Sequence, residues 1–375
     1  MPAWEPEGLP SLVLRHRTRG SMPSESITYP RDLRTGRSIW SARRARGVDH
    51  HDLVRDIACD VVVVGAGISG ALIAETLSEA GLDIVIVDRR GPLKGSTAAS
   101  TAMLQYELDT PVCRMAARIG RDRAERLWRR SRLAVDALRE RTRRLGIAAD
   151  DATRGSIYLD GNVLDPAGLA EEAEARRRAG LEIELLGPAA VEQRYGIKGR
   201  HAIIGFGNYT ADPRKMTAGY LNVAIRRGAR LYAPVDICEV VPEERGVTLH
   251  RLAGPSIRAR TVVMATGYEM MKGVPRMGNK IISSWSIATR AQPRHIWPGA
   301  SLIWEASDPY LYIRTTPRGE IICGGEDEEI SDADARDAKL ADKTASLSRK
   351  LGALLPGIDP TPAFAWAGSF GTSPI

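Results

Sequence analysis

The sequence lacks several features that would by themselves assign a function. No apolar run approaches the ~20 residues that cross a bilayer, so no transmembrane segment is expected. The four cysteines form no CxxC pair and have no histidines at metal-ligand spacing. Neither a disulfide framework nor a metal site is therefore predicted, and reduced thiols favour a cytoplasmic protein. Motifs such as GxSxG and HExxH are also missing, and no catalytic side-chain nucleophile is predicted.

The charge balance does not identify a partner. The chain has 53 basic and 46 acidic residues, a net charge of +7. Attraction to nucleic acid or a membrane is one interpretation. The other is a solvated, arginine-rich helix over 121–145, in which Leu127, Ser131, Val135 and Leu138 form one stripe at helical spacing. We favour the helix and expect no nucleic-acid partner.

The N-terminal region, residues 1–56, lacks clear periodicity and is rich in Arg, Ser and Pro. It is predicted to be an irregular arm. Arg43 and Arg44 superficially resemble a twin-arginine signal, but no apolar segment follows, so export is not expected. Met22 is an alternative start of the natural protein.

Residues 60–70, DVVVVGAGISG, contain the strongest motif. The valines predict a strand that is buried on both faces, as in the centre of a parallel sheet. Gly65 permits a tight turn, Gly67 lets a pyrophosphate approach the backbone, and Gly70 lets the next helix pack on the strand. The pattern GxGxxG is weak alone, and its context decides its meaning.

The residues after the glycines provide the helix, second strand and terminal acidic residue that this motif requires. A helix is predicted at 71–81, with its N-terminal amides facing the phosphates, and a second buried strand at 83–88. Asp88 ends this strand, where its carboxylate can accept hydrogen bonds from ribose hydroxyls. The sequence therefore predicts a dinucleotide-binding βαβ unit, but this unit does not by itself distinguish FAD from NAD.

A second GxG, in IIGFGNYT at 203–210, is interpreted as a turn because the third glycine is replaced by Thr210. Asp212 and Pro213 instead predict the start of a helix that runs to about Arg227. The absence of a second nucleotide fingerprint argues against bound NAD(P)H in addition to the first cofactor.

Beyond the βαβ unit, several segments resemble the D-amino-acid-oxidase-like (DAO) family of FAD-dependent oxidoreductases. They are residues 60–90, GSTAAST at 95–101, DPRKMT at 212–217, TVVMATG at 261–267, and YLYIRTTPRGEIICGGEDE at 310–328. The resemblance covers roughly residues 60–370, and it implies FAD as the cofactor.

The resemblance also implies cofactor contacts beyond the glycine turn. Ser96 and Thr97 would contact the pyrophosphate, Ala99 to Met103 would line one flavin face, and the backbone of Val235 would meet the adenine. The cofactor-binding residues predicted in this way are Gly65, Ala66, Gly67, Ile68, Ser69, Gly70, Asp88, Arg89, Ser96, Thr97, Ala99, Met103, Val235, Ala265, Thr266 and Gly267.

The implied fold is α/β: a Rossmann-like FAD-binding domain, with a parallel sheet and flanking helices, interleaved with an α+β substrate domain on an antiparallel sheet. The predicted FAD-binding domain comprises 57–110, 150–165 and 200–270, and the substrate or cap domain comprises 111–149, 166–199 and 271–363. Residues 364–375 would begin a C-terminal FAD-binding segment.

Substrate contacts are predicted on one strand. Tyr310, Tyr312 and Arg314 are spaced i, i+2, i+4, so they point to one face. A guanidinium beside two phenols could hold a substrate carboxylate by a bidentate pair. The alternative is a solvated strand face, and the resemblance favours the substrate site.

The resemblance implies hydride transfer from the carbon of a small amine or amino acid to flavin N5, giving an imine that hydrolyses, with O₂ or a quinone as electron acceptor. Relatives continue past FAWAGSF (364–370) into a closing helix, so we expect weak FAD retention and low activity for a chain that stops at Ile375. The alternatives are an NAD-dependent dehydrogenase and a truncated, non-catalytic remnant that binds nucleotide weakly. Substrate identity and oligomeric state stay open.

Overall fold

The structure, a computed structural model, describes residues 25–43, 47–274 and 278–373. The predictions about Met22, Arg44 and Ile375 lie outside these residues. The chain forms two compact units. Unit 1 comprises Met1–Arg31, Asp49–Pro92 and Ala224–Met277, and unit 2 comprises Asp32–Val48, Leu93–Val223 and Gly278–Ile375. Among the described residues, every helix is too short or too polar to traverse a bilayer.

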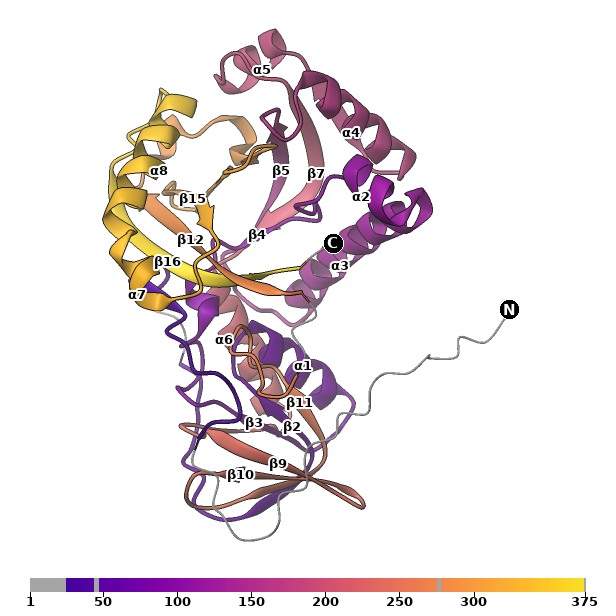
Figure 1. Ribbon diagram of the computed structural model, residues 1–375, viewed down its shortest axis with the longest axis vertical. Helices are drawn as coiled ribbons and strands as arrows, with labels where there is room; N and C mark the ends of the chain where they lie inside the picture. The colour runs from indigo at the N-terminus through magenta and orange to yellow at the C-terminus, as the bar shows by residue number, and fades with distance from the viewer. Residues whose placement is uncertain (1–24, 44–46, 275–277, 374–375) are drawn as a thin grey trace. The chain divides into compact units, whose positions relative to one another are not determined.

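Unit 1 is built on a sheet with the strand order β8-β3-β2-β11-β10-β9 (Figure 1). Strands β8, β3, β2 and β11 are parallel, and β10 and β9 continue the sheet in antiparallel fashion. The elements are β2 (Ile57–Val64), α1 (Ile68–Glu79), β3 (Ile84–Val87), β8 (Arg230–Tyr232), β9 (Ile237–Glu243), β10 (Gly246–Arg251) and β11 (Ile257–Met264). This arrangement confirms the predicted βαβ unit.

The central strands of unit 1 are apolar because both of their faces are covered. Val61–Val64 and Ile84–Val87 are all buried. Such continuous apolar runs are typical of parallel strands between two layers. Asp60 lies within β2, directly before the buried run Val61–Val64, and Asp83 directly precedes β3. Both carboxylates are therefore at the opposite end of these apolar runs from the glycine turn.

Unit 2 is built on a larger, mixed sheet with the order β1-β16-β12-β15-β14-β13-β5-β7-β4, in which β6 also pairs with β7. Its strands are β1 (Arg34–Arg37), β4 (Met103–Leu104), β5 (Ala152–Leu159), β6 (Ile183–Leu186), β7 (Ala202–Thr210), β12 (Lys280–Thr289), β13 (Leu302–Glu305), β14 (Leu311–Thr315), β15 (Ile321–Glu328) and β16 (Pro362–Thr372). Neighbouring strands are mostly antiparallel, as predicted.

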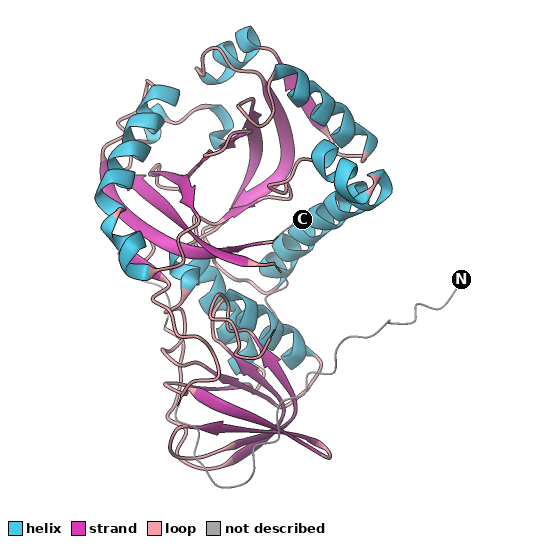
Figure 2. Cartoon of the chain, in the orientation of Figure 1, coloured by secondary structure: helices cyan, strands magenta, loops and turns pink. Residues whose placement is uncertain are grey.

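The helices of unit 2 lie along this sheet (Figure 2). They are η1 (Ser96–Ala99), α2 (Val112–Ile119), α3 (Arg121–Arg144), α4 (Pro166–Arg178), α5 (Pro188–Tyr195), η2 (Pro293–His295), η3 (Pro298–Ala300), α7 (Ala333–Ala338) and α8 (Leu340–Leu354). Helix α6 (Pro213–Arg226) contains residues of both units.

Strands β14 and β15 present two distinct faces. Ile313 and Cys323 pack in one core with Leu347 and Leu351 of α8, and we call this side the helix face. Tyr312 lies opposite Gly324 on the other side, which we call the tyrosine face. The alternation follows from the period-2 geometry of a strand.

A buried charge lies among the aromatic residues of unit 2. Arg176 and Glu172 of α4 are both fully buried, and the Nε and Oε1 atoms that pair are 2.8 Å apart. The guanidinium carbon is 4.7 Å from the ring centroid of Trp128 and 4.9 Å from that of Tyr158. Trp304 stacks on Tyr158 at 3.9 Å. Cation–π contacts therefore supplement the ion pair.

Three expectations differ from the structure. The segment 203–210 is not a turn but part of strand β7, which tolerates Gly207 at φ +86° beside a register shift. Leu127 is 39% exposed, because Trp128 takes the buried position on α3. The arm is not irregular throughout, since β1 pairs with β16.

The boundaries of the units also differ from the predicted domains. Residues 93–110, 150–165 and 200–223 belong to unit 2, although they were assigned to the FAD-binding domain. The reason is pairing: β5 and β7 join the antiparallel sheet rather than the parallel one. Sequence order does not reveal which sheet a strand enters.

Candidate functional site

The glycine turn of unit 1 is closely packed against neighbouring backbone. Gly65 follows β2 with φ +119°, and a Cβ there would overlap the carbonyl oxygen of Ala265. A Cβ at Gly70 would overlap the carbonyl oxygen of Gly65. Gly67 is the N-cap residue of α1 and offers only backbone. Glycines at which backbone packs this closely, directly at the start of a helix, are what a pyrophosphate site requires.

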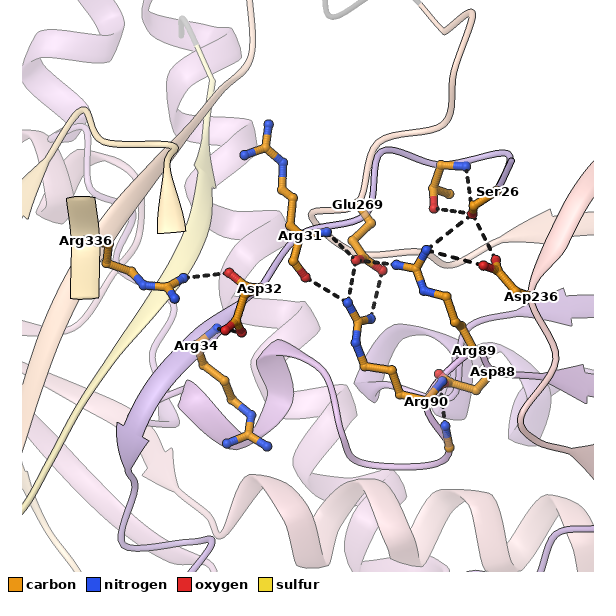
Figure 3. A network of polar contacts seen from close by, with 12 residues as sticks. Ser26, Arg31, Asp32, Arg34, Asp88, Arg89, Arg90, Asp236, Glu269 and Arg336 are labelled. Atoms are coloured by element: carbon orange, nitrogen blue, oxygen red, sulfur yellow. Dashed lines mark hydrogen bonds and ion pairs between the residues drawn. The ribbon is translucent and has the colours of Figure 1, made fainter. Parts of the chain in front are cut away.

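Asp88 fastens two loops at this end of the sheet (Figure 3). Its Oδ2 accepts a hydrogen bond from the amide of Ala66 at 2.8 Å, and its Oδ1 accepts from the amides of Arg90 and Gly91, each at 2.8 Å. The carboxylate thus fixes the glycine turn relative to the loop after β3. Its predicted contact with a ribose stays a prediction.

Arg89 and Arg90 form an ion-pair network with Glu269 in unit 1 (Figure 3). Arg90 donates to both carboxylate oxygens of Glu269, at 2.9 and 2.6 Å, and the amide of Arg31 donates to Oε1 at 2.8 Å. Burial disfavours the charged carboxylate, but these hydrogen bonds and the nearby arginine charges hold the pKa of Glu269 below its usual range.

The network bears on the predicted role of Arg89. Its Nη1 donates to Ser26 at 3.2 Å and lies 3.7 Å from Asp236, so the guanidinium is engaged within the protein. Its cofactor contact stays a prediction. The network does join the loop after β3 to the segment around Glu269, which follows β11.

Val235 and the segment Ala265–Gly267 lie at the same edge of the sheet as Asp88. The amide of Val235 donates to the carbonyl of Asp88 at 2.9 Å, and the amide of Ala265 donates to the carbonyl of Val64 at 2.8 Å. Gly267 has φ +60°, which favours glycine. The residues predicted from unit 1 are thus brought together at the carboxyl ends of its parallel strands, where α/β sheets bind ligands.

The remaining predicted cofactor residues lie in unit 2, in and after η1. The indole of Trp366 donates to the carbonyl of Ala99 at 2.8 Å, and that of Trp40 donates to the carbonyl of Ser100 at 2.7 Å. Met103 begins β4 and pairs with Thr210. The Oγ of Ser96 is buried and has no hydrogen-bond partner among the described residues. A buried hydroxyl without a partner fits a ligand-binding segment.

Arg314 differs from its predicted role. The side chain is 1% exposed, and its Nη1 donates to the carbonyls of Thr101, Ala102 and Ala211 at 3.1, 2.8 and 2.8 Å. Its Nε donates to the carbonyl of Thr315 at 3.1 Å. A bidentate bond to a carboxylate uses two adjacent donors of the guanidinium, either Nη1 with Nη2 or Nε with Nη2. Each of these pairs includes an atom that already donates to backbone. Arg314 therefore holds backbone instead.

Tyr310 and Tyr312 lie together on the tyrosine face, with ring centroids 5.6 Å apart. The hydroxyl of Tyr312 is 2.7 Å from Oγ of Ser284, and its ring occupies the space that a side chain at position 324 would fill. The i, i+2, i+4 spacing thus describes the shared face correctly, although contact of these residues with a substrate stays a prediction.

Sequence reasoning missed Asp327, which adjoins Tyr310 and Ser284. Burial, and to a lesser degree the charge of Asp109, raises the pKa of Asp327 to about 6, against the effect of those two hydroxyls. In the sequence, Asp327 is only part of the acidic run Glu326–Glu329, and such a run is typical of solvated surface.

Comparison with known proteins identifies the family. Residues 60–374 match the family model DAO, described as FAD dependent oxidoreductase. The chain belongs to this family, and its cofactor is FAD. The tight backbone cradle at Gly65 and Gly70 fits the pyrophosphate of such a cofactor, since a Cβ at either glycine would clash with a neighbouring carbonyl.

Two curated relatives are similar over part of their length. Gamma-glutamylputrescine oxidoreductase of Escherichia coli is 25% identical over 232 residues, which cover 61% of this chain and 53% of that protein. The putative Rieske 2Fe-2S iron-sulfur protein YhfW of Bacillus subtilis is 21% identical over 248 residues, which cover 66% of this chain and 47% of that protein. The chain spans about half the length of these curated relatives.

Solved structures share the fold. Glycine oxidase from Geobacillus kaustophilus superposes with a TM-score of 0.68 at 18% identity, covering 84% of each chain. Iminodiacetate oxidase from Chelativorans sp. BNC1 has a TM-score of 0.66 at 18% identity, covering 84% of each chain. At these identities the likeness establishes the predicted mixed α/β fold.

Proposed function

We propose that this protein oxidises the C–N bond of a small amine or amino acid, giving an imine that water hydrolyses. The observation that carries the proposal is the glycine cradle of unit 1, in which a Cβ at Gly65 or Gly70 would clash with a neighbouring carbonyl and Gly67 is the N-cap residue of α1. The family membership and the amine and amino-acid substrates in the names of its relatives support the same reaction class.

When bound, FAD supplies the acceptor for the hydride that leaves the substrate carbon. The protein would contribute binding and orientation. The amides of Gly67 to Gly70 would hold the pyrophosphate, and Asp88 would accept hydrogen bonds from the ribose. In unit 2, Ser96 and the segment Ala99–Met103 would contact the cofactor, and Tyr310 and Tyr312 would form a wall for the substrate.

A visible spectrum of the protein purified in the presence of FAD tests the proposal first. The flavin absorption band is expected, and its size relative to the protein absorbance gives the fraction of chains that hold FAD. Under anaerobic conditions, a panel of amines and amino acids is then added, and the band should bleach with at least one member. Readmission of air, compared with addition of a soluble quinone, identifies the electron acceptor. A protein that binds no flavin and instead reduces NAD⁺ would overturn the proposal.

A further inference from the structure

The further inference concerns the residues around Asp327 on the tyrosine face. Asp327, Tyr310, Tyr312 and Ser284 all retain partial exposure, so the cluster is neither sealed in a core nor free in solvent. We call these four residues the Asp327 cluster. It lies entirely within unit 2.

A β-bulge directs Asp327 to this face. Trp285 pairs with Gly325 and Ser283 pairs with Glu328, so the single residue Ser284 lies opposite two residues of β15. Glu326, the first of these two, adopts φ +60°, a strained conformation for a residue other than glycine. Bulges with this geometry re-aim side chains and are common beside active sites.

The bulge reverses the alternation of the strand. Gly324 is on the tyrosine face, so regular alternation would place Glu326 there as well. Glu326 instead bonds to Lys343 at 3.3 Å and to Ser346 at 2.9 Å, both on α8 at the helix face. Asp327 consequently joins Tyr310 on the tyrosine face.

The carboxylate of Asp327 has unused hydrogen-bonding capacity. Its Oδ1 is buried and lacks a hydrogen-bond partner among the described residues. The hydroxyls of Tyr310 and Ser284 adjoin this side chain and act to lower its pKa. A buried carboxylate oxygen without a donor is unfavourable in the empty protein, and a cation that donates a hydrogen bond would satisfy it.

The aromatic neighbours favour the same ligand. The rings of Tyr310 and Tyr312, with centroids 5.6 Å apart, flank the cluster, and phenol faces attract ammonium groups. The arginine that was expected to attract a carboxylate, Arg314, is instead bonded to backbone. The nearby charge of Asp109 adds to the negative potential, and Lys343 opposes it.

The position of the cluster along the strand indicates how far its ligand would lie from the predicted flavin-lining segment. Arg314 holds Thr101 and Ala102, which belong to the predicted flavin-lining segment. Tyr312 of β14 and Tyr310, which directly precedes β14, are two and four residues from Arg314, about 7 and 13 Å at 3.3 Å per residue. If Thr101 and Ala102 line the flavin as predicted, a group bound at the Asp327 cluster would lie away from the flavin along this strand.

We propose that the Asp327 cluster binds a second, protonated amino group of the substrate, so that the preferred substrates are aliphatic diamines and related amines with a remote ammonium group. This inference rests on the proposed function. It selects among amine substrates: glycine and sarcosine lack a second ammonium group and would leave the cluster unfilled.

The test compares putrescine with butylamine, which has the same carbon chain and one amino group fewer. For the unaltered protein, kcat/KM for putrescine should exceed that for butylamine by about 100-fold or more, in line with a charge-assisted pair. Asp327→Asn should reduce kcat/KM for putrescine about 10- to 100-fold and leave the value for butylamine within about twofold.

Glu329→Gln is the matched control, because Glu329 is exposed and its ion pair is with Lys280. It should leave both substrates unaffected. Above about pH 6, Asp327→Asn should unfold in one cooperative transition at a temperature no lower than that of the unaltered protein, which shows that the variant folds.

Calorimetric titration with putrescine adds a readout that does not depend on turnover. If putrescine binds, Asp327→Asn weakens this binding and no flavin is reduced, the proposed oxidation is refuted. Ammonium binding at the Asp327 cluster is then supported. Turnover of butylamine and putrescine with equal efficiency would refute the cluster and support the proposed function. Absence of both binding and turnover would overturn both.

Discussion

The glycine turn of unit 1 and the tyrosine face of unit 2 are built in opposite ways. The turn consists of backbone: Gly65, Gly67 and Gly70 make room by having no side chain. The tyrosine face consists of side chains from separate strands, with Ser284 on β12, Tyr312 on β14 and Asp327 on β15. On the proposed function, the first would bind the cofactor that family members share, and the second would vary with the substrate.

The difference extends to polar groups. In unit 1, both oxygens of Asp88 and of Glu269 are paired with donors of the protein. On the tyrosine face, one oxygen of Asp327 is buried and has no hydrogen-bond partner within the described part of the chain. Paired groups stabilise a scaffold, whereas unpaired buried groups indicate a place where a ligand completes the bonding.

The largest effect is expected at the glycine turn. Gly70→Ala places a Cβ against the carbonyl oxygen of Gly65 and should abolish FAD binding and turnover. The flavin content of the purified variant is the measurement. Gly357→Ala is the control, because nothing lies within 4 Å of a Cβ at that position. A Gly70→Ala protein with full flavin content would contradict the backbone cradle.

The next effect concerns stability in unit 2. Glu172→Gln leaves the fully buried Arg176 without its counter-charge and should lower the free energy of unfolding by about 3–5 kcal/mol. Urea titration measures this loss. Glu174→Gln on the same helix breaks an exposed pair with Arg177 and should change stability by only about 0–1 kcal/mol. Equal effects of the two substitutions would contradict a buried ion pair.

A smaller effect separates the two roles considered for Arg314. Arg314→Lys loses the Nε donor to the carbonyl of Thr315 and carries its charge on a shorter side chain, so it should lower the free energy of unfolding by about 1–3 kcal/mol. It should also weaken FAD binding, because the segment Ala99–Met103 loses its anchor. KM for an amino acid should change no more than KM for an amine. A rise in KM for amino acids alone would instead support the predicted bidentate bond between Arg314 and a substrate carboxylate.

The smallest expected effect is a pH dependence at Asp327. Burial raises its pKa to about 6, so the carboxyl group is neutral below that pH. Since only the ionised form attracts an ammonium group, kcat/KM for putrescine should fall by up to about tenfold per pH unit below about 6. The pH profile of Asp327→Asn should lack this fall. An identical profile would show that another group titrates.

The same shift predicts the effect of Asp327 on stability. Its pKa is higher in the folded protein than in the unfolded chain, so the folded state binds the proton more tightly. The contribution of Asp327 to the free energy of unfolding is therefore fully present below about pH 4 and is lost as the pH rises to about 6. Asp327→Asn should remove this dependence, which urea titrations across that range would measure.

The sequence predicted the elements of unit 1 because their determinants are local. A valine run, a glycine turn and a terminal Asp88 are contiguous and follow one strand–helix–strand unit, which the structure confirms as β2, α1 and β3. For β7 the same reasoning was wrong. The pairing of β7 with β5 and β6, rather than the glycines in its own sequence, determines its conformation.

By itself, the sequence determined the dinucleotide fold of unit 1 and the common face of Tyr310, Tyr312 and Arg314, because strand and helix periods are local properties. Only the tertiary structure decided which partners those side chains have. Arg314 contacts backbone from residues 101, 102 and 211, and Asp327 reaches Tyr310 through a bulge opposite Ser284. Contacts between residues distant in sequence depend on the packing of the whole sheet, which no local pattern encodes.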